Sequence, residues 1–461
     1  MVIFVANCLE EILMKRLIDH HLRKWKDSPL RQPLLLRGAR QVGKTYAVRE
    51  LGKTFSSFVE INFELNKRAR NIFEHDLDPK RILREIATLT GVEIEVGKTL
   101  LFFDEIQTVP EGILALRYFY EVLPELHVIA AGSLLDFAIQ QVGVPVGRVQ
   151  FLYMYPLSFI EFLSALGHSL IIKEILSHPV EEEISEVIHN KIFELLGSYL
   201  AVGGMPQAVV CWKNMLSLHA CSQIPQMLVD AYQYDFVKYG KSHQVKYLDL
   251  LFSRIPQQLG KAFKFSQIGD FRKRELDPCV DLMVTAGVLH RVVYSDAQGI
   301  PLGAQADTMV FKLLFLDVGL SQFILDFKTG DWLLNPLETF VNKGMIAESF
   351  VGQELVAYEH PVKKAQLYYW KRDASGNSAE VDYVIQRERE IIPIEVKSGK
   401  GRTLRSIQSF LNSHQNSHYG IRFSTNNYSV YEKIHSYPLY AIAKIMISNE
   451  DVKDSLNALI A

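Results

Sequence analysis

The sequence predicts an α/β protein of several domains, the first of them built around a parallel sheet. Between residues 33 and 159, short apolar runs alternate with helical stretches, which is typical of strands that helices cover on both faces. From about residue 160 to 245, apolar residues recur at intervals of three and four, which indicates helices. Apolar runs of strand length return after residue 310, so we expect a second α/β domain there.

The bulk properties of the chain limit its partners and its location. Its 461 residues correspond to about three domains at ~150 residues each. The formal net charge is only −2, so nucleic acid would have to bind through a local patch. No uncharged apolar run approaches the ~20 residues of a membrane span, and we therefore expect no membrane partner and a cytoplasmic location. The four cysteines lack the C-x-x-C spacing of a zinc site.

Five near-continuous apolar runs predict the strands of the first sheet. They are residues 33–37, 57–63, 99–105, 127–133 and 149–159. An amphipathic helix begins at Met14, which is a natural start for the fold, so residues 1–13 are expected to be an extension that adds little. The first domain is therefore predicted over residues 14–165.

One loop of this domain has the composition of a phosphate-binding loop, or P-loop. Residues 38–45 read GARQVGKT between a predicted strand and a predicted helix. The spacing G-x-x-x-x-G-K-T lets backbone amides surround phosphate oxygens, and the N-terminus of the following helix faces the same anion. Lys44 is expected to reach the β- and γ-phosphates, and Thr45 to offer its hydroxyl to Mg²⁺.

The P-loop predicts that the protein binds ATP or GTP with Mg²⁺. The expected nucleotide-binding residues of the loop and the following turn are Gly38, Ala39, Arg40, Gln41, Val42, Gly43, Lys44, Thr45 and Tyr46. No N-K-x-D-type motif for guanine recognition appears in the α/β region. ATP is therefore the expected nucleotide.

Polar residues at the ends of two later strands extend this site. Asp104 and Glu105 follow the run LLFF, at the carboxyl edge where ligands of parallel sheets bind. Asp104 is expected to hold Mg²⁺ through water, and Glu105 to polarise the attacking water, which favours hydrolysis over binding alone. Ser133 ends the next strand and either contacts the γ-phosphate or water, or belongs to an ordinary turn.

Arg148 stands in the loop before the fifth predicted strand. An arginine there can act as a finger on the nucleotide of a neighbouring subunit, which accelerates hydrolysis by ~10³–10⁵ where it operates. Such a role implies a homo-oligomer. The alternative is an ordinary surface arginine.

The middle of the chain is predicted to hold a helical segment over residues 166–245 and a winged-helix-like module over 246–300. The module consists of short helices followed by the strand HRVVYSD. Basic residues gather in it, and they either contact phosphates in a salt-sensitive way or form a solvated surface. They are Lys261, Lys264, Arg272, Lys273 and Arg274.

The last domain is predicted over residues 301–461, and two of its strands carry charged residues in alternation. In IIPIEVKSG, alternation puts Glu395 and Lys397 on one face of the strand. In SAEVDYVIQ it puts Glu380 and Asp382 together, opposite Val381 and Tyr383. Two adjacent strands of this kind bring Asp382, Glu395 and Lys397 into one pocket.

This pocket has the residue types of a metal-dependent nuclease site. Asp382 and Glu395 would hold Mg²⁺ or Mn²⁺ through carboxylate oxygens. Lys397 would orient or deprotonate a metal-bound water. Glu348, in a helical stretch, is a further candidate ligand, and Glu354 in the same helix is a weaker one. A solvated charged strand face also produces the E-x-K spacing, and a degenerate site keeps a fold without its chemistry.

A second group of basic residues follows these acidic strands. The stretch KSGKGRTLR supplies Lys397, Lys400, Arg402 and Arg405. These residues either contact the phosphates of a nucleic acid or remain solvated.

Taken in order, these motifs resemble a large prokaryotic family of AAA+-type P-loop ATPases. Its members carry a C-terminal domain of uncharacterised function that is similar to PD-(D/E)XK nucleases. Besides the acidic strands, the matching stretches are GARQVGKT (38–45), LLFFDEIQ (100–107), AAGSLL (130–135), GR (147–148), YPLSFIEF (155–162), VGGMP (202–206) and FKLLFLDVGL (311–320).

The resemblance implies an AAA+ core, a helical segment, a winged-helix-like module and a restriction-endonuclease-like end domain. It implies no settled biological role. The helical segment offers no sure arginine for the second sensor of AAA+ enzymes, so that residue stays unplaced.

Two functions fit the sequence. In the first, an ATPase controls a nuclease-like domain that acts on DNA or RNA. In the second, ATP binding sets a switch without further catalysis, and the C-terminal domain is a degenerate nuclease fold that binds DNA or protein.

Overall fold

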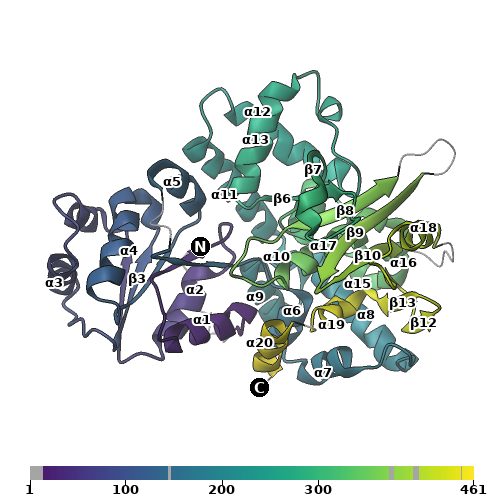
Figure 1. Cartoon of the computed structure of the whole chain (residues 1–461), viewed down its shortest axis with the longest axis horizontal. Coiled ribbons are helices and arrows are strands. Elements are labelled where there is room, and N and C mark those ends of the chain that lie inside the picture. Colours follow the sequence, from purple (N-terminus) through teal and green to yellow (C-terminus); the bar gives the residue numbers. More distant parts are fainter. Residues whose placement is uncertain (1–13, 144–146, 373–377, 398–403, 448, 461) are drawn as a thin grey trace.

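Two β-sheets stand apart in the molecule, with helices between them (Figure 1). The structure is a computed structural model that describes residues 14–143, 147–372, 378–397, 404–447 and 449–460. The five-stranded sheet belongs to the N-terminal part of the chain, and the eight-stranded sheet to the C-terminal part.

The five-stranded sheet is parallel throughout and has the order β2-β3-β4-β1-β5. Its strands are β1 (Leu34–Arg37), β2 (Ser57–Asn62), β3 (Thr99–Asp104), β4 (His127–Ala131) and β5 (Gln150–Tyr153). The associated helices are α1 (Leu17–Asp27), α2 (Lys44–Gly52), η1 (Lys67–Phe73), α3 (Pro79–Thr90), η2 (Ile106–Thr108), α4 (Pro110–Val122) and α5 (Leu135–Val142). β3 and β4 are buried along their whole length, as the near-continuous apolar runs predict.

The fifth strand is shorter than the sequence predicts. β5 ends at Tyr153, whereas the predicted strand runs to residue 159. Ser158 accepts a hydrogen bond from the backbone N–H of Glu161, and the Glu161 carboxylate accepts one from the Ser158 N–H. This reciprocal capping box begins a helix, so the apolar residues from Phe159 onward belong to that helix and not to the strand.

Helices form the middle of the chain, as predicted. They are α6 (Phe159–Ala165), α7 (Ser169–Ser177), α8 (Glu186–Val202), α9 (Pro206–Met215), α10 (Leu218–Cys221), α11 (Gln223–Tyr239), α12 (Val245–Arg254), η3 (Ile255–Gln258), η4 (Phe265–Gln267) and α13 (Lys273–Thr285).

The eight-stranded sheet is mixed and has the order β12-β13-β11-β10-β9-β8-β6-β7. Its strands are β6 (Leu289–Ser295), β7 (Ala306–Phe315), β8 (Leu367–Arg372), β9 (Ala379–Arg387), β10 (Glu390–Lys397), β11 (Gly420–Ser424), β12 (Ser429–Tyr431) and β13 (Ile434–Pro438). Its helices are η5 (Leu302–Gln305), α14 (Val318–Ile324), α15 (Asp331–Leu334), α16 (Pro336–Asn342), α17 (Gly344–Ala357), α18 (Arg405–Ser413), η6 (Leu439–Ala441), α19 (Ile442–Met446) and α20 (Glu450–Ile460).

The strand of the predicted winged-helix-like module belongs to this large sheet. β6 pairs with β8 in parallel and with β7 in antiparallel fashion. The predicted boundary at residues 300 and 301 therefore falls between two strands that pair with each other. The division of the chain at residues 165, 245 and 300 stays a prediction.

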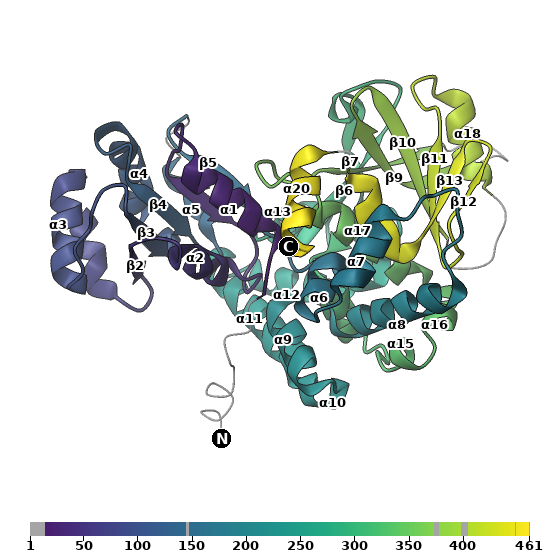
Figure 2. The ribbon, with the colours of Figure 1, turned by 90° about the horizontal axis from the view of Figure 1, so that it is seen from below.

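The first and last described helices pack side by side (Figure 2). Lys24 of α1 forms an ion pair with Asp451 of α20, at 2.6 Å. The hydroxyl of Ser455 lies 3.1 Å from Nε2 of the buried His21. The N-terminal domain is thus completed by a segment from the far end of the chain. Among the described helices, none has the length and apolarity to cross a membrane.

Candidate functional site

The P-loop lies between the interior strand β1 and helix α2, where the sequence places it. Gly38 and Gly43 have φ angles of +145° and +101°, a backbone region that favours glycine. A Cβ atom on Gly38 would lie 2.2 Å from the backbone oxygen of Met154. The loop therefore requires glycine for its path, and the backbone amides of such a loop can surround phosphate oxygens.

Lys44 is buried at the start of α2, and its ammonium group is held by neutral partners. Its Nζ donates hydrogen bonds of 2.8 Å to the backbone oxygens of Gly38 and Ala39. Burial lowers the pKa of Lys44 to about 8, although Glu105 and Asp104 act in the opposite direction. The lysine is thus a poorly compensated buried cation at the centre of the loop, which suits an anionic ligand.

Thr45 and Asp104, both predicted to serve Mg²⁺, lie in direct contact. The Thr45 hydroxyl donates to Oδ2 of Asp104 at 3.2 Å. The side-chain amide of Asn62, at the end of β2, donates to the same oxygen at 3.1 Å. Burial, followed by the charge of Glu105, raises the pKa of Asp104. The hydroxyl and the carboxylate fit a hydrated Mg²⁺ bound together with a nucleotide.

Glu105 is held in a strained backbone conformation directly after β3. Its φ is +54°, which is uncommon for a residue other than glycine and is found at functional sites. The side-chain amide of Gln107 donates to Oε2 of Glu105 at 2.6 Å. Gln107, whose role the sequence did not disclose, therefore fixes the direction of the Glu105 carboxylate.

Ser133 lies at the same edge of the sheet as these groups. β4 stands between β1 and β3, and Ala131 is in register with both Leu36 and Asp104. Ser133 lies two residues after Ala131, just as Gly38 lies two residues after Leu36. A Cβ atom on the neighbouring Gly132 would overlap the side chain of Gln107. The predicted position of Ser133 beside the P-loop and Glu105 is consistent with this register.

Arg148 lies before the start of β5, at the amino ends of the strands and therefore at the side of the sheet opposite the P-loop. Its Nε is 3.1 Å from Oε1 of Glu121, near the end of α4, and its side chain is 46% exposed. The carboxyl ends of the strands hold the P-loop, so Arg148 cannot reach the nucleotide site of its own chain. A role for it requires a second subunit.

Helix α11 of the middle region contacts the P-loop directly. Nη1 of Arg40 donates to both oxygens of the buried Asp235 carboxylate, at 3.0 and 3.2 Å. The hydroxyl of Tyr232, one turn earlier, donates to the backbone oxygen of Arg40 at 2.7 Å. Lys238 on the same helix lies 3.5 Å from Glu64. Helix α11 thus contacts both the loop after β1 and the loop after β2.

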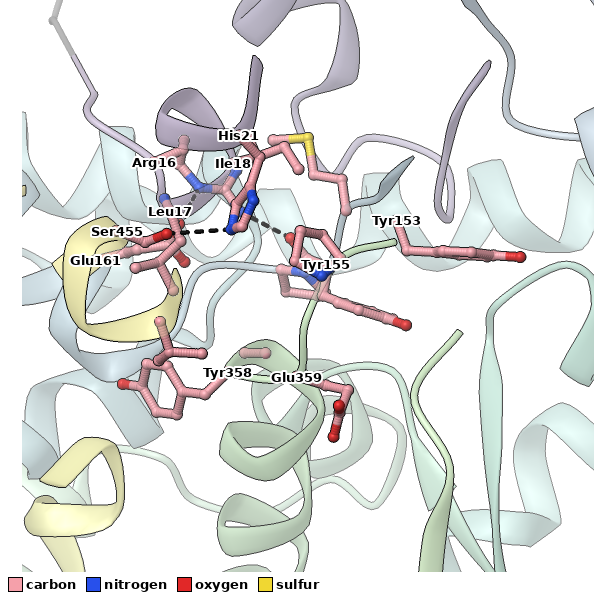
Figure 3. Close-up of a pocket in the computed structure, with 15 residues that line it drawn as sticks. Arg16, Leu17, Ile18, His21, Tyr153, Tyr155, Glu161, Tyr358, Glu359 and Ser455 are labelled. Carbon is pink, nitrogen blue, oxygen red and sulfur yellow. Dashed lines mark hydrogen bonds and ion pairs between the residues drawn. The ribbon is translucent and has the colours of Figure 1, made fainter. Parts of the chain in front are cut away.

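Arg16 supports the P-loop from the other side. Its guanidinium donates to the backbone oxygens of Val42 and Tyr155, and its Nε pairs with the buried carboxylate of Glu161 at 2.8 Å. Arg16 and Glu161 line a pocket that α1, α20 and the end of α17 also border (Figure 3). The loop is therefore anchored by a residue that lies before α1.

Most of the predicted residues of the C-terminal pocket gather around a lysine that the sequence analysis does not single out. Lys312, on β7, points its Nζ to Glu348 Oε1 at 3.0 Å and to Glu380 Oε1 at 2.5 Å. The Asp382 carboxylate lies 3.9 Å away. Burial raises the pKa of Glu348 to about 7, and Asp382 adds to this effect.

The remaining two predicted residues, Glu395 and Lys397, form their own ion pair on β10. Asp382 is linked to this strand because its Oδ2 accepts a hydrogen bond of 2.7 Å from the Val396 N–H. The Glu395 carboxylate is buried, and no hydrogen-bond partner of its Oε2 is found among the described residues. Burial also raises the pKa of Glu395.

The alternation predicted for β9 fails at one point. Asp382 approaches Lys312, while the hydroxyl of the adjacent Tyr383 donates to the backbone oxygen of Glu348 at 2.9 Å. Two consecutive residues therefore face α17, where the sequence predicts opposite faces. The register between β8 and β9 shifts between Tyr368 and Trp370, and such a bulge breaks the period of two.

Glu354, the weaker candidate ligand, lies away from this pocket. Its Oε1 accepts a hydrogen bond of 2.8 Å from the Phe159 N–H at the start of α6. Burial raises the pKa of Glu354 to about 8. The residue therefore joins α17 to the N-terminal part of the chain.

The carboxylates of the C-terminal pocket do not fit a divalent cation as they are placed. Such a cation needs several oxygen ligands converging on one point, and here the ammonium of Lys312 stands between Glu348, Glu380 and Asp382. Among the described residues, no group of three or more His, Cys, Asp or Glu side chains is arranged to hold a metal ion.

The basic residues of the middle region form an exposed patch near the start of α13. Lys273 lies 5.5 Å above the ring of Phe265, and the neighbouring Phe271 is also exposed. All five predicted residues are exposed, namely Lys261, Lys264, Arg272, Lys273 and Arg274. Of the second basic group, Lys400 and Arg402 lie outside the described residues, and Arg405 begins α18.

Comparison with protein families finds three matches along the chain. An AAA domain matches residues 30–163. Two domains of unknown function, DUF8612 and DUF4143, match residues 193–331 and 343–442. No curated protein matches the chain.

Comparison with solved structures finds remote similarities. The Walker-type ATPase PABY2304 of Pyrococcus abyssi is 13% identical, with a TM-score of 0.44 over 68% of this chain and 99% of that one. The ORC1 protein of Aeropyrum pernix in complex with DNA is 11% identical, with a TM-score of 0.30 over 71% and 95%. A katanin structure is 15% identical, with a TM-score of 0.21 over 37% and 56%.

The family match and the geometry of the P-loop agree. Residues 30–163 form a P-loop ATPase domain of the AAA type. Its strand order, its glycine loop and the contact between Thr45 and Asp104 all belong to this domain. The predicted nuclease-like and winged-helix-like parts match only domains of unknown function.

Proposed function

We propose that the protein hydrolyses ATP at the P-loop and uses the nucleotide state to control how the rest of the chain engages nucleic acid. The observation that carries the proposal is the contact between the Thr45 hydroxyl and the Asp104 carboxylate, beside a buried Lys44. Bound Mg²⁺ would supply positive charge to the β- and γ-phosphates. Thr45 and Asp104 are the residues that would hold it.

Within this proposal, each residue has a separate task. The P-loop amides and Lys44 bind the phosphates. Glu105, held by Gln107 at 2.6 Å, orients a water molecule and draws its proton during attack on the γ-phosphate. Ser133 contacts the γ-phosphate or that water. Arg148 acts on the nucleotide of a neighbouring subunit.

The test of hydrolysis is the variant Glu105→Gln, which keeps the shape of the side chain and removes its basicity. We expect ATP affinity to be retained and turnover to fall by about 10²–10⁴-fold, the usual contribution of a general base. Glu111→Gln, an exposed residue in the first turn of α4, is the matched control. Normal turnover in Glu105→Gln would remove Glu105 from this role.

The role of Arg148 predicts a homo-oligomer and has its own test. If the arginine acts on a neighbouring subunit, ATP turnover per chain rises with protein concentration in the parent. The rise is absent in Arg148→Ala. A specific activity that stays flat over a wide range of concentration in the parent contradicts the trans role.

The proposed link from the nucleotide to the rest of the chain begins at Arg40. Its guanidinium stands on the P-loop and is paired with Asp235 of α11. Triphosphate close to Arg40 competes with Asp235 for this charge, because both ligands are anionic. Helix α11 packs against α12 and α14, and α14 packs against α17. A shift of α11 is therefore passed to the helix that carries Glu348.

We further propose that nucleic acid is the partner, contacted through the exposed basic patch at the start of α13. Each phosphate contact contributes a slope of about −0.9 to the dependence of log affinity on log salt for duplex DNA. Replacing Arg272, Lys273 and Arg274 by alanine should weaken binding and reduce this slope by about two to three units. Replacing Lys67 and Arg68, also exposed, gives a control variant that loses two positive charges outside the patch. An unchanged slope in the first variant excludes the patch.

For the C-terminal domain we favour binding of nucleic acid over cleavage. The succession of α17, the antiparallel pair β9 and β10, α18 and β11, parallel to β10, is compatible with the nuclease-like fold that the resemblance implies. Its carboxylates, however, are not arranged for a metal. The competing outcome is cleavage of labelled DNA or RNA with Mg²⁺ or Mn²⁺ that Asp382→Ala and Glu395→Ala both abolish.

A further inference from the structure

Lys312 is a charged residue in a strand that is otherwise apolar. It interrupts the run VFKLLF on β7, and its side chain is only 2% exposed. A buried ammonium is unfavourable unless anions surround it. Lys312 is therefore stable in this position only because of the groups that surround its Nζ.

These groups come from two other elements of the C-terminal domain. Glu348 lies on α17, and Glu380 and Asp382 lie on β9, so that three carboxylates converge on one Nζ. The ring of Tyr369 on β8 lies 5.0 Å from the same nitrogen. The ammonium thus lies between Glu348 and Asp382, two of the three carboxylates that the sequence assigns to a metal.

Two of the three carboxylates, those of Glu348 and Asp382, have little freedom to turn towards another ligand. A Cβ atom on Gly260 would lie 2.9 Å from Oε2 of Glu348, so the backbone after η3 closes on that oxygen. Oδ2 of Asp382 accepts the Val396 N–H. The oxygens that face inward are therefore the ones that Lys312 already contacts.

The charges in this cluster can also be compared with those of a metal site. A divalent cation would bring two positive charges. Lys312 brings one positive charge to the same three carboxylates, so it offsets part of the negative charge that such a cation would neutralise.

We propose that Lys312 is a resident cation that fills a latent divalent-cation position between Glu348, Glu380 and Asp382. The parent protein then binds no divalent cation at this position, and removal of the lysine side chain creates a site for one. This inference concerns the C-terminal domain alone and does not depend on ATP hydrolysis.

The test compares the parent with Lys312→Ala, without nucleotide, by thermal unfolding and by electron paramagnetic resonance of Mn²⁺. All proteins carry Asp104→Asn, which removes the other candidate cation site. In the presence of EDTA we expect Lys312→Ala to unfold on the order of 10 °C below the parent, because the largely shielded carboxylates of Glu348 and Asp382 lose their counter-ion. Mn²⁺ should restore a large part of this difference and bind to the variant, whereas the parent shows neither effect.

Lys364→Ala is the matched control. Lys364 is also largely buried, but its Nζ donates to a backbone oxygen, that of Val284, at 3.1 Å. Loss of this lysine leaves no carboxylates to be bridged, so Mn²⁺ should not raise the unfolding temperature of this variant. Rescue of Lys312→Ala and not of Lys364→Ala separates a specific site from general stabilisation by metal.

Three results would overturn the proposal. The first is binding of Mn²⁺ to the parent that Glu348→Gln abolishes, since the position would then be open. The second is a folded Lys312→Ala that gains no stability from Mn²⁺. If Lys312→Ala does not fold at all, the triple variant with Glu348→Gln and Glu380→Gln should fold and ignore Mn²⁺; its failure to fold would be the third.

Discussion

Two buried lysines, one in each half of the chain, have opposite surroundings. Lys44 donates to the backbone oxygens of Gly38 and Ala39, which carry no net charge, and burial lowers its pKa to about 8. Lys312 meets Glu348, Glu380 and Asp382, and these carboxylates raise its pKa against the effect of burial.

The difference explains why one lysine indicates a binding site and the other does not. A cation that only dipoles hold gains from an added anion such as a triphosphate. A cation among several carboxylates already has its counter-ions and stabilises the fold that brings them together. A charged residue type alone therefore does not identify a site; the charge of its neighbours does.

The largest expected effects come from replacing each lysine by methionine. Lys44→Met should lose at least about 100-fold in ATP affinity, or ~2.7 kcal/mol, with little change in stability. Lys312→Met should lose about 3–5 kcal/mol of unfolding free energy, as expected for a buried ion pair that loses one partner, with little change in ATP affinity. Calorimetry and denaturant unfolding measure the two quantities, and a loss of both in either variant would break the comparison.

A pH series should distinguish the two lysines without mutation. The free protein holds Lys44 with a pKa of about 8, and bound phosphate favours its charged form. ATP affinity should therefore be constant below about pH 8 and should fall by up to about tenfold per pH unit above it. Titration calorimetry in buffers of different ionisation enthalpy would detect the accompanying proton uptake. An affinity that is constant to pH 9.5 contradicts this assignment.

A smaller effect concerns Glu348, whose pKa is raised to about 7 from an ordinary 4.5. A raised carboxyl pKa favours the folded state below 4.5, and this contribution is lost as the pH rises towards 7. The parent should therefore lose about 1–3 kcal/mol between pH 4.5 and 7 relative to Glu348→Gln. The measurement is urea unfolding of both proteins across this range, and parallel curves would argue against the raised pKa.

The smallest effect is expected from Asp235→Asn, which weakens the link between α11 and the P-loop. We expect a change of about two- to tenfold in the apparent ATP affinity, in the range of typical coupling energies. Asp230→Asn, an exposed position on the same helix, is the control. An equal ATP affinity of the two variants would show that the contact between Arg40 and Asp235 does not respond to the bound nucleotide.

The sequence predicted the arrangement of the P-loop and Asp104 because the signals for it are local. The glycines of the P-loop, the following Lys44 and Thr45, and the acidic pair Asp104 and Glu105 lie next to the strands and helix that position them. Parallel strands bring their carboxyl ends to one edge, so the contact between Thr45 and Asp104 could be expected from the order of elements alone.

The C-terminal cluster was predicted only in part because it depends on distant residues. Glu348, Asp382 and Glu395 were found by their types and spacing, but Lys312 lies on the far edge strand β7. Its signal was present in the sequence: a lysine in an otherwise apolar strand implies a buried partner. The pairing of Arg40 with Asp235 joins residues 195 positions apart, so no local sequence pattern predicts it.

The packing of α20 on α1 has a consequence for biosynthesis. His21 and Lys24 of α1 contact Ser455 and Asp451 of α20, and α20 follows every other described helix and strand in the chain. While the segments before α20 are being translated, the ATPase domain therefore exposes the part of α1 that α20 covers in the folded molecule. We expect the nascent chain to need shielding there until α20 docks.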